Sequence, residues 1–201
     1  YADAFSVIGL AEYSKVTRDR SIGLASEKIM DSMLRRIDQG GYKTAPYEIP
    51  SPYNSHGIPM IIISTLRVLS SMKESFSEDV SRLYREEKKY LDLIFSLHYD
   101  RETNLIREYV SPSPDYSRLL DRHINPGHTL EDAWFWIESM ESQGVLSENI
   151  ALISDIIKKT FDISWDNEYG GLFRFVDRKG GKPKGKTNGS SYECLVKETW
   201  N

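Results

Sequence analysis

Apolar residues recur at helical spacing along most of the chain. Phe5, Ile8 and Ala11 lie three or four positions apart, and the polar run 17–19 ends that stripe. The same periodicity predicts further helices at about 21–37, 58–72, 78–97, 126–144 and 147–161. The segment 171–177 alternates instead, which predicts one arm of a short β-hairpin.

The predicted helices come in pairs, and each pair is followed by an aspartate, a turn residue and an apolar residue. The three segments are 38–42, 99–105 and 165–172. Tyr42 and Leu105 are 63 residues apart, and Leu105 and Leu172 are 67 apart. This repetition predicts stacked helix pairs with short hairpins between them, in an open solenoid or a closed ring. No low-complexity linker divides the chain, so we expect residues 1–201 to form a single domain or part of one.

Composition excludes some classes of function. The net charge is −4 among 201 residues, which gives no general attraction to nucleic acid or to an anionic membrane. The longest apolar stretch, 58–63, is far too short for a membrane span. The single cysteine, Cys194, cannot form an internal disulfide, so we expect a reducing, cytoplasmic location and a passive thiol.

The most informative segment runs from Asn125 to Trp136. Asn125 suits a helix N-cap and Pro126 the first helical position, which places His128 in the first turn. Glu131 follows three residues later on the same face. One interpretation is an acid–base pair, in which Glu131 orients the ring or holds a sugar hydroxyl. The other is a histidine that caps a helix above a packed core.

The helix dipole decides which form of His128 we expect. The positive end of the dipole favours a neutral imidazole. A neutral imidazole can accept a proton from a carbon next to a carbonyl group.

The motif Pro-Gly-His-x-x-Glu-x-x-Trp at 126–134 resembles the signature of the N-acylglucosamine 2-epimerase family. Further similar segments occur in the family's order: 1–13, the Pro-Met helix start at 59–62 and the Gly-Gly-Leu hairpin at 165–177. The resemblance covers essentially the whole chain. It implies an all-α fold, an (α/α)6-barrel of about six helix pairs, of which this chain would be about half. We therefore expect a partial domain with residues missing on both sides, and the chain alone is not expected to turn over sugar.

The resemblance also implies the reaction, a sugar 2-epimerisation or aldose–ketose isomerisation without a cofactor. A base removes the proton at C2 of the open sugar, and the enediolate is reprotonated at C2 or at C1. His128 matches one of the family's two catalytic histidines and Glu131 its helix partner. The second histidine and a binding arginine would lie outside the chain. The expected partner is a free aldose or an N-acyl hexosamine, and relatives often form homodimers.

Four residues are candidates for substrate binding: Asn54, His56, Trp134 and Trp200. Asn54 and His56 precede the Pro-Met helix, where an Asn-x-His occurs in related cellobiose epimerases, although a solvated loop is the alternative. Trp134 also suits packing, and Trp200 would stand at the entry of the family's Trp-rich helix.

The other motifs favour structural explanations. We expect His98 and His123 to be structural or surface residues. The four histidines lack the sequence spacing of a metal site. Residues 180–187 fit a P-loop pattern, but no helix is predicted directly after them, which favours a solvated basic loop.

Two other functions remain open from the sequence. A glycoside hydrolase would need two carboxylates facing the cleft, and only Glu131 is an obvious candidate. A non-catalytic relative that binds sugar or protein would need neither histidine chemistry nor paired acids.

Overall fold

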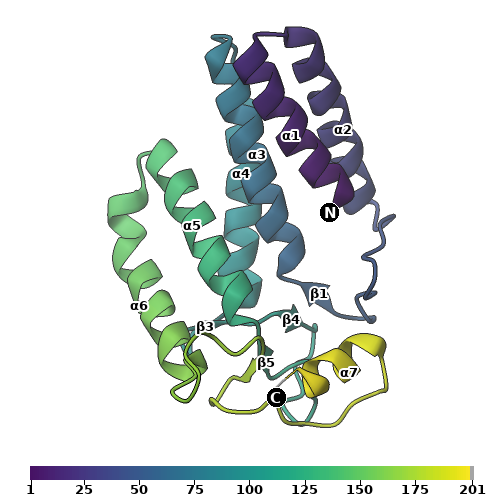
Figure 1. The fold of residues 1–201 in the computed structure, drawn as a ribbon, viewed down its shortest axis with the longest axis vertical. Coiled ribbons are helices and arrows are strands. Elements are labelled where there is room, and N and C mark those ends of the chain that lie inside the picture. Colours follow the sequence, from purple (N-terminus) through teal and green to yellow (C-terminus); the bar gives the residue numbers. More distant parts are fainter. Residues whose placement is uncertain (200–201) are drawn as a thin grey trace.

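The computed structural model describes residues 1–199, and its helices form three antiparallel pairs (Figure 1). The helices are α1 (Ala2–Thr17), α2 (Arg20–Asp38), α3 (Gly57–Ser75), α4 (Ser81–Leu93), the π-helix η1 (Ile94–His98), α5 (Pro126–Ser142), α6 (Leu146–Ser164) and α7 (Ser191–Glu198). The strands are β1 (Asn54–Ser55), β2 (Tyr99–Asp100), β3 (Leu105–Ile106), β4 (Tyr109–Val110), β5 (His123–Ile124) and β6 (Val176–Asp177).

The pairs stack through their odd-numbered helices. α1 packs on α2, α3 on α4 and α5 on α6, while α3 also contacts α1 on one side and α5 on the other. Helices α1, α3 and α5 therefore form one layer, and their partners lie outside it (Figure 1). This confirms the helix pairs that the sequence predicts.

The central position of α3 follows from its sequence. The run from Pro59 to Ile63 is apolar on every face, and all five of these side chains are buried. A helix that is hydrophobic all round must be covered on several sides. α3 accordingly contributes a large share of a core that draws residues from all three pairs.

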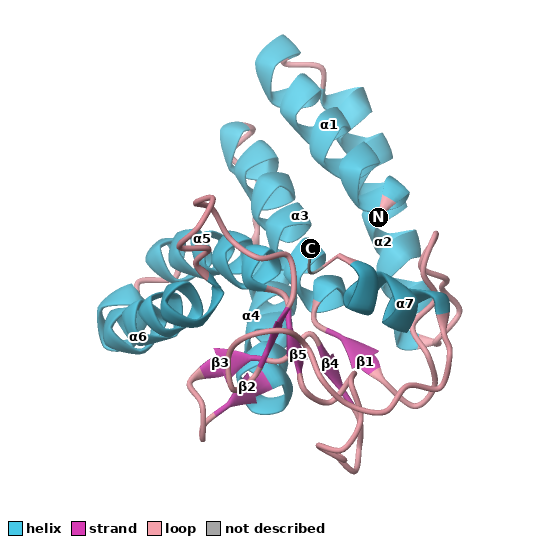
Figure 2. Cartoon of the chain, turned by 60° about the horizontal axis from the view of Figure 1, so that its bottom comes forward, coloured by secondary structure: helices cyan, strands magenta, loops and turns pink. Residues whose placement is uncertain are grey.

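The strands gather at one end of the helix layer, together with α7 (Figure 2). They form three antiparallel pairs: β1 with β4, β2 with β3, and β5 with β6. The β1–β4 pairing joins the residues just before α3 to a segment that follows η1. This joining is what later brings side chains of distant segments together.

Three sequence expectations need correction. The first pair, α1 and α2, is followed by a turn and an irregular loop instead of a hairpin. The predicted hairpin arm at 171–177 forms only one local bridge, Leu172 with Trp165, and its end joins β5 as β6. Four consecutive residues, Phe175 to Arg178, are buried, so both faces of this segment are covered. The alternation of apolar and polar residues therefore did not predict its strand pairing.

Two helical features were not foreseen. The helix predicted at 78–97 ends its α-helical part at Leu93 and continues as the π-helical turn η1. Helix α7 begins at a capping box, in which the Ser190 hydroxyl accepts a hydrogen bond from the Glu193 amide and the Glu193 carboxylate accepts one from the Ser190 amide.

Ion pairs fasten the long loop after α6 to the rest of the strand end. Asp177 is buried and accepts hydrogen bonds from Nε and an Nη of Arg122 at 2.7 and 2.8 Å. The next residue, Arg178, donates to Asp100 at 2.7 Å and lies over the ring of Tyr116. None of the described helices is long and apolar enough to cross a membrane.

One buried charge weakens this core. Glu87 on α4 is 0% exposed, its two oxygens lack a hydrogen-bond partner within the described residues, and Nη1 of Arg67 lies 4.0 Å away. Burial raises the pKa of Glu87 above its ordinary value. The folded protein therefore binds the Glu87 proton more tightly than the unfolded chain does. The loss of stability caused by the Glu87 charge is absent below the unfolded-state pKa, grows as the pH rises from there, and is complete above the folded-state pKa.

We therefore expect Glu87→Gln to stabilise the protein at neutral pH, by about 1 kcal/mol. Chemical denaturation at pH 7 measures the effect, and the gain should shrink as the pH approaches 4.5, the ordinary value for a glutamate. Glu86→Gln, one residue earlier and partly exposed, is the matched control and should change stability little. A loss of stability in Glu87→Gln would show that the carboxylate has a partner that the structure lacks.

Candidate active site

His128 faces a cavity of about 360 Å³ at the strand end of the helix layer. Such a volume suits a small ligand. Its walls come from the N-terminus of α1, the loop before β1, the start of α5, the loop before β6 and α7. The lining residues are Tyr1, Thr44, Ala45, Pro46, Tyr47, Ile49, Ser55, Glu108, Tyr109, Asn125, His128, Arg174, Phe175, Tyr192 and Leu195.

The start of α5 has the expected form. The Asn125 side chain accepts a hydrogen bond from the His128 amide at 3.3 Å, and Pro126 is the first helical residue. The cap fixes the first turn, so the imidazole projects from a rigid helix end. The His128 side chain is 36% exposed, which leaves part of the ring accessible from the cavity.

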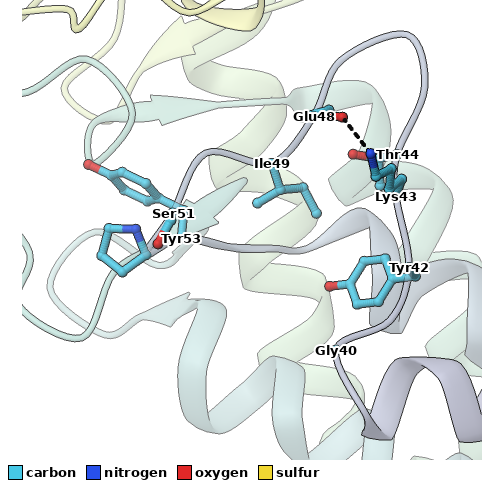
Figure 3. A pocket seen from close by; sticks show the side chains of 9 residues that line it. Gly40, Tyr42, Lys43, Thr44, Glu48, Ile49, Ser51 and Tyr53 are labelled. Atoms are coloured by element: carbon cyan, nitrogen blue, oxygen red, sulfur yellow. Dashed lines mark ion pairs between the residues drawn. The ribbon is translucent and has the colours of Figure 1, made fainter.

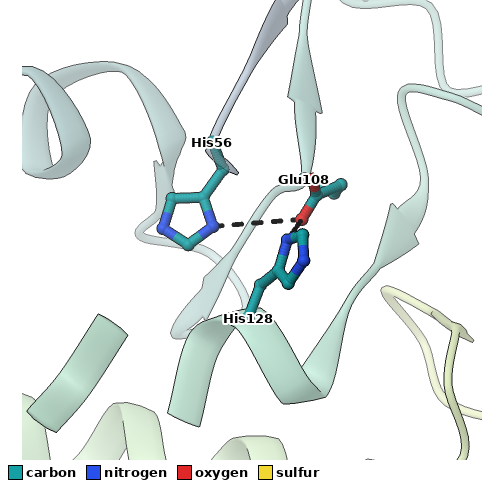
Figure 4. Close-up of side chains that lie close together, drawn as sticks. All are labelled: His56, Glu108 and His128. Atoms are coloured by element: carbon teal, nitrogen blue, oxygen red, sulfur yellow. Dashed lines mark hydrogen bonds and ion pairs between the residues drawn. The ribbon is translucent and has the colours of Figure 1, made fainter. Parts of the chain in front are cut away.

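The ring is held by Glu108, a residue that the sequence analysis did not identify. Oε2 of Glu108 lies 3.0 Å from Nδ1 of His128 (Figure 4). Glu108 itself is only 3% exposed. A carboxylate at Nδ1 fixes the tautomer, so Nδ1 carries the hydrogen and Nε2 is the free nitrogen. Pairing of β1 with β4 delivers Glu108, since its carbonyl oxygen accepts a hydrogen bond from the His56 amide at 2.8 Å.

A second buried histidine lies on the other side of Glu108. Nδ1 of His56 is 3.9 Å from the same Oε2 (Figure 4). On its other side, Nε2 of His56 is 2.6 Å from Oδ2 of Asp132. Burial opposes the protonation of His56, but the two carboxylates outweigh it and raise its pKa to about 9. The two imidazoles together hold the pKa of Glu108 well below its usual range, although burial opposes its ionisation.

The downward pKa shift expected for His128 from the helix dipole is not found. Burial does act to lower its pKa, but the charge and hydrogen bond of Glu108 outweigh burial, and the pKa is raised above 6.5. The helix dipole is thus a smaller influence than a carboxylate at hydrogen-bonding distance. The ring therefore holds a proton more readily than a free imidazole does.

Among the predicted site residues that the structure describes, His56 belongs to the cluster around this ring, and the others lie apart from it. Glu131 is exposed and affects His128 only through its charge, since the hydrogen bond comes from Glu108. Asn54 is exposed on β1, and His56 is 1% exposed and does not line the cavity. Trp134 is 58% exposed and faces a different groove, between α1, α3 and α5. Trp200 lies outside the described residues.

The remaining histidines are buried and serve packing. His98, at the end of η1, lies 5.5 Å from the His56 ring and accepts no charge, because burial lowers its pKa to about 3. His123 is 0% exposed and makes hydrogen bonds with the Leu120 carbonyl and the Tyr192 hydroxyl. Burial likewise lowers the pKa of His123.

Side-chain nitrogen and oxygen atoms of His56, Glu108 and His128 that could bind a metal lie within 4.8 Å of one another. The spacing of the histidines in the sequence gave no sign of this cluster. Three such groups from distant segments have the composition of a metal site. Here, however, the facing atoms of Glu108 and His128 are already joined as hydrogen-bond donor and acceptor. The cluster is thus held together by its own hydrogen bond and ion-pair contacts.

Aromatic rings form the wall opposite this cluster. Tyr47, Tyr109 and Phe175 pack around Tyr192, which α7 brings to the cavity. Rings of this kind offer apolar faces to the C–H groups of a sugar and hydroxyls to its oxygens. To predict this wall from the sequence, one would have to predict helix α7. The sequence signal for α7 is the capping box formed by Ser190 and Glu193.

Beside His128 the backbone leaves no room for a side chain. A Cβ on Gly57, the first residue of α3, would lie 2.6 Å from the Tyr1 hydroxyl and 3.7 Å from Cε1 of His128. The Tyr1 ring, from the start of the chain, thus fills the space between α3 and the catalytic candidate.

A larger hollow, of about 460 Å³, lies in the loop between α2 and β1 (Figure 3). Its charged residues, Lys43 and Glu48, are exposed and pair with each other at 3.8 Å. This hollow shares Thr44 and Ile49 with the cavity of His128, so the two are neighbours. It lacks a buried proton-transfer group among its lining residues, and we do not regard it as the active site.

Comparisons with known proteins show the family of the chain. Residues 1–190 match the family model of N-acylglucosamine 2-epimerase. The chain is 26% identical to N-acylglucosamine 2-epimerase of Mus musculus over 183 residues, which are 90% of this chain and 43% of that protein. It is 25% identical to the enzyme of the same name from Rattus norvegicus, over 88% of this chain and 42% of that protein. The chain thus spans less than half the length of the curated relatives it matches.

Solved structures show the same fold. A cellobiose 2-epimerase from Bacillus thermoamylovorans superimposes with a TM-score of 0.64 at 16% identity, over 88% of this chain and 48% of that one. A D-mannose isomerase superimposes with a TM-score of 0.65 at 14% identity, over 90% and 49%. These matches confirm the expected all-α barrel class, of which this chain represents about half.

The hydrogen bond from His128 to Glu108 leads to a direct prediction. In Glu108→Gln the carboxylate charge is lost while burial persists, so the pKa of His128 should fall below its wild-type value. A histidine-selective NMR titration of the full-length protein measures it. Glu102→Gln removes a carboxylate from an exposed turn that pairs with Arg178, and it should leave His128 unchanged. An unchanged or higher pKa in Glu108→Gln would contradict the proposed pairing.

Proposed function

Because the chain belongs to the N-acylglucosamine 2-epimerase family, we propose that the protein is a sugar 2-epimerase or aldose–ketose isomerase in which His128 transfers the proton at C2. The observation that carries the proposal is the pairing of Nδ1 of His128 with a buried carboxylate while the rest of the ring faces a cavity. That pairing leaves Nε2 as the reactive nitrogen.

The chemistry follows from that placement. The open-chain sugar carries an aldehyde at C1, which makes the hydrogen on C2 acidic. Nε2 of neutral His128 takes that proton, the C2–H bond breaks, and its electron pair passes through the new C1–C2 double bond to the C1 oxygen, giving an enediolate. Glu108 stabilises the imidazolium that forms, as the aspartate does in a Ser-His-Asp triad.

The position of reprotonation decides the product. A proton delivered to C1, together with transfer of the C2 hydroxyl proton to the C1 oxygen, gives the ketose, and His128 can supply the proton at C1 from the same face. A proton delivered to C2 from the opposite face gives the 2-epimer and requires a second acid. The family resemblance implies a second histidine for this role, outside the present chain.

The substrate class follows from the cavity and from the relatives. Its aromatic wall and its volume of about 360 Å³ suit a monosaccharide ring or chain. The similar proteins are named for N-acylglucosamine, cellobiose and mannose. We therefore propose a free aldose or an N-acyl hexosamine as the substrate.

The same cavity gives little support to glycoside hydrolysis. Hydrolysis needs two carboxyl groups on either side of the scissile bond, one of them protonated. Among the described residues that line the cavity, Glu108 is the one carboxylate, and its pKa is held well below its usual range. It therefore cannot serve as the general acid.

Solvent exchange at C2 tests the proposal. The full-length protein is incubated with a panel of aldoses in D2O, and loss of the C2 proton is followed by NMR. We expect exchange with at least one sugar, and His128→Ala should slow it by about 100-fold or more because the general base is lost. Tyr169→Ala, at an 83% exposed position, serves as the control and should exchange at the wild-type rate.

Each other outcome is decisive. A folded protein that exchanges no sugar would refute the epimerase proposal, and release of reducing sugar from a glycoside would replace it with hydrolysis. Exchange at the full rate in His128→Ala would refute the role of His128 but not the epimerase proposal itself.

A further inference from the structure

Four side chains form a continuous buried series that ends at the cavity. Asp132 lies 2.6 Å from His56, His56 lies 3.9 Å from Glu108, and Glu108 lies 3.0 Å from His128. Asp132, His56 and Glu108 are 0%, 1% and 3% exposed. Asp132 and His56 come from distant parts of the sequence, and neither lines the cavity. The proposed reaction therefore assigns them no role.

A buried series of charges is costly unless it performs a task. Burying an ion pair costs about as much free energy as the pair regains, and an apolar pair of similar size is often as stable. Here Oδ1 of Asp132 also lacks a hydrogen-bond partner among the described residues. Stability alone is therefore a poor explanation for Asp132 and His56.

We propose that Asp132 and His56 are positioning residues for His128: their ion pair holds the Glu108 carboxylate in place and limits how strongly Glu108 stabilises the His128 imidazolium. The inference rests on the proposed function, since it concerns the same proton-transfer group. Neither residue lines the substrate cavity: their ion pair contacts Glu108, and the His56 charge also acts directly on His128.

The sign of each influence on His128 can be stated. Burial raises the pKa of Asp132 although His56 opposes it, but the two carboxylates also raise the pKa of His56 to about 9; because the imidazole lies between two carboxylates, we take His56 as the cation of the series. The Glu108 charge favours protonated His128, whereas the His56 charge opposes it. Asp132, four residues after His128 on α5, also acts on His128 through its charge, but less strongly than His56 does.

Other titratable or charged groups surround the series on every packed element. They are Tyr1 before α1, His98 on η1, Arg107 and Tyr109 beside Glu108, His123 on β5, Glu131 on α5, Arg174 before β6 and Tyr192 on α7. Burial keeps the two histidines among them neutral, and it keeps Tyr1, Tyr109 and Tyr192 protonated. Besides Glu108, the acids that act on His128 through their charge include Glu131 and Asp132.

Asp132→Asn tests the inference because it predicts an unexpected direction. Without the carboxylate His56 loses its proton, the repulsion that it exerts on His128 disappears, and the Glu108 charge acts on His128 alone. The pKa of His128 should therefore rise, although a negative charge has been removed. Histidine-selective NMR titration of the full-length protein, with a chelator present, measures it without any need for turnover.

Glu131→Gln is the matched control. It removes the same charge from the adjacent residue of the same helix, but Glu131 acts on His128 directly, so the pKa of His128 should fall slightly. A fall in Asp132→Asn as well would mean that Asp132 acts only as a nearby charge. An unchanged titration would mean a purely structural pair. Either result overturns the inference.

Kinetics provide a second measurement. In Asp132→Asn the acidic limb of kcat/KM should move to higher pH, with a loss of about threefold or more at pH 6. KM at the pH optimum should stay unchanged, because Asp132 does not touch the cavity. A changed KM with an unmoved limb would again indicate a structural role.

The wild-type protein keeps the inference testable if Asp132→Asn does not fold. His56 should remain protonated over the pH range in which His128 titrates, and a neutral His56 at pH 7 would overturn the inference. The proposed function fails separately, when no sugar exchanges its C2 proton, and the NMR titration still decides the role of Asp132 and His56.

Discussion

The strand end of this molecule depends on keeping one carboxylate ionised away from water. Glu108 has only 3% of its surface exposed, so its charge must be balanced by groups within hydrogen-bonding reach. Two imidazoles provide that balance, and each of them begins a helix of the inner layer: His56 precedes α3, and His128 lies in the first turn of α5. The short β1–β4 pairing brings Glu108 between these two helix starts. The geometry of the site is thus a consequence of how two helices must enter the core beside a buried charge.

The division of labour between helices and connections follows from this arrangement. The apolar faces of α1, α3 and α5 create a rigid layer, and the chemistry is carried by residues at its edge. Residues near helix starts are positioned by backbone caps such as Asn125, whereas loops such as 40–53 supply shape. A sugar epimerase fold therefore persists at 14–16% identity, because the layer requires only apolar periodicity.

Residues that act within one helix were predictable from the sequence, and residues that act across the fold were not. The positions of α1 to α6 and the cap at Asn125 follow from local spacing, whereas the choice of His128 as the catalytic candidate rested on the family resemblance. Glu108 lies in an extended segment 20 residues from its partner, and no periodicity relates the two. Asp132 was hidden beside Glu131, the acid at the motif position, because only packing against α3 decides which of two adjacent acids turns inward. Trp134 is largely exposed for the same reason, since the face of α5 that packs is the one that carries Asp132 and Trp136.

The contact between Tyr1, Gly57 and His128 has a consequence for the order in which the site is assembled during folding. These residues come from the beginnings of three different helix pairs. The Tyr1 hydroxyl fills the space that Gly57, which has no side chain, leaves open beside His128. Contacts of such large sequence separation form late, after the local helices and hairpins. A chain in which only one or two pairs have docked contains the histidine but lacks the walls around it. The cavity beside His128 is therefore complete only when all three pairs have docked, because its walls include residues that belong to each of them.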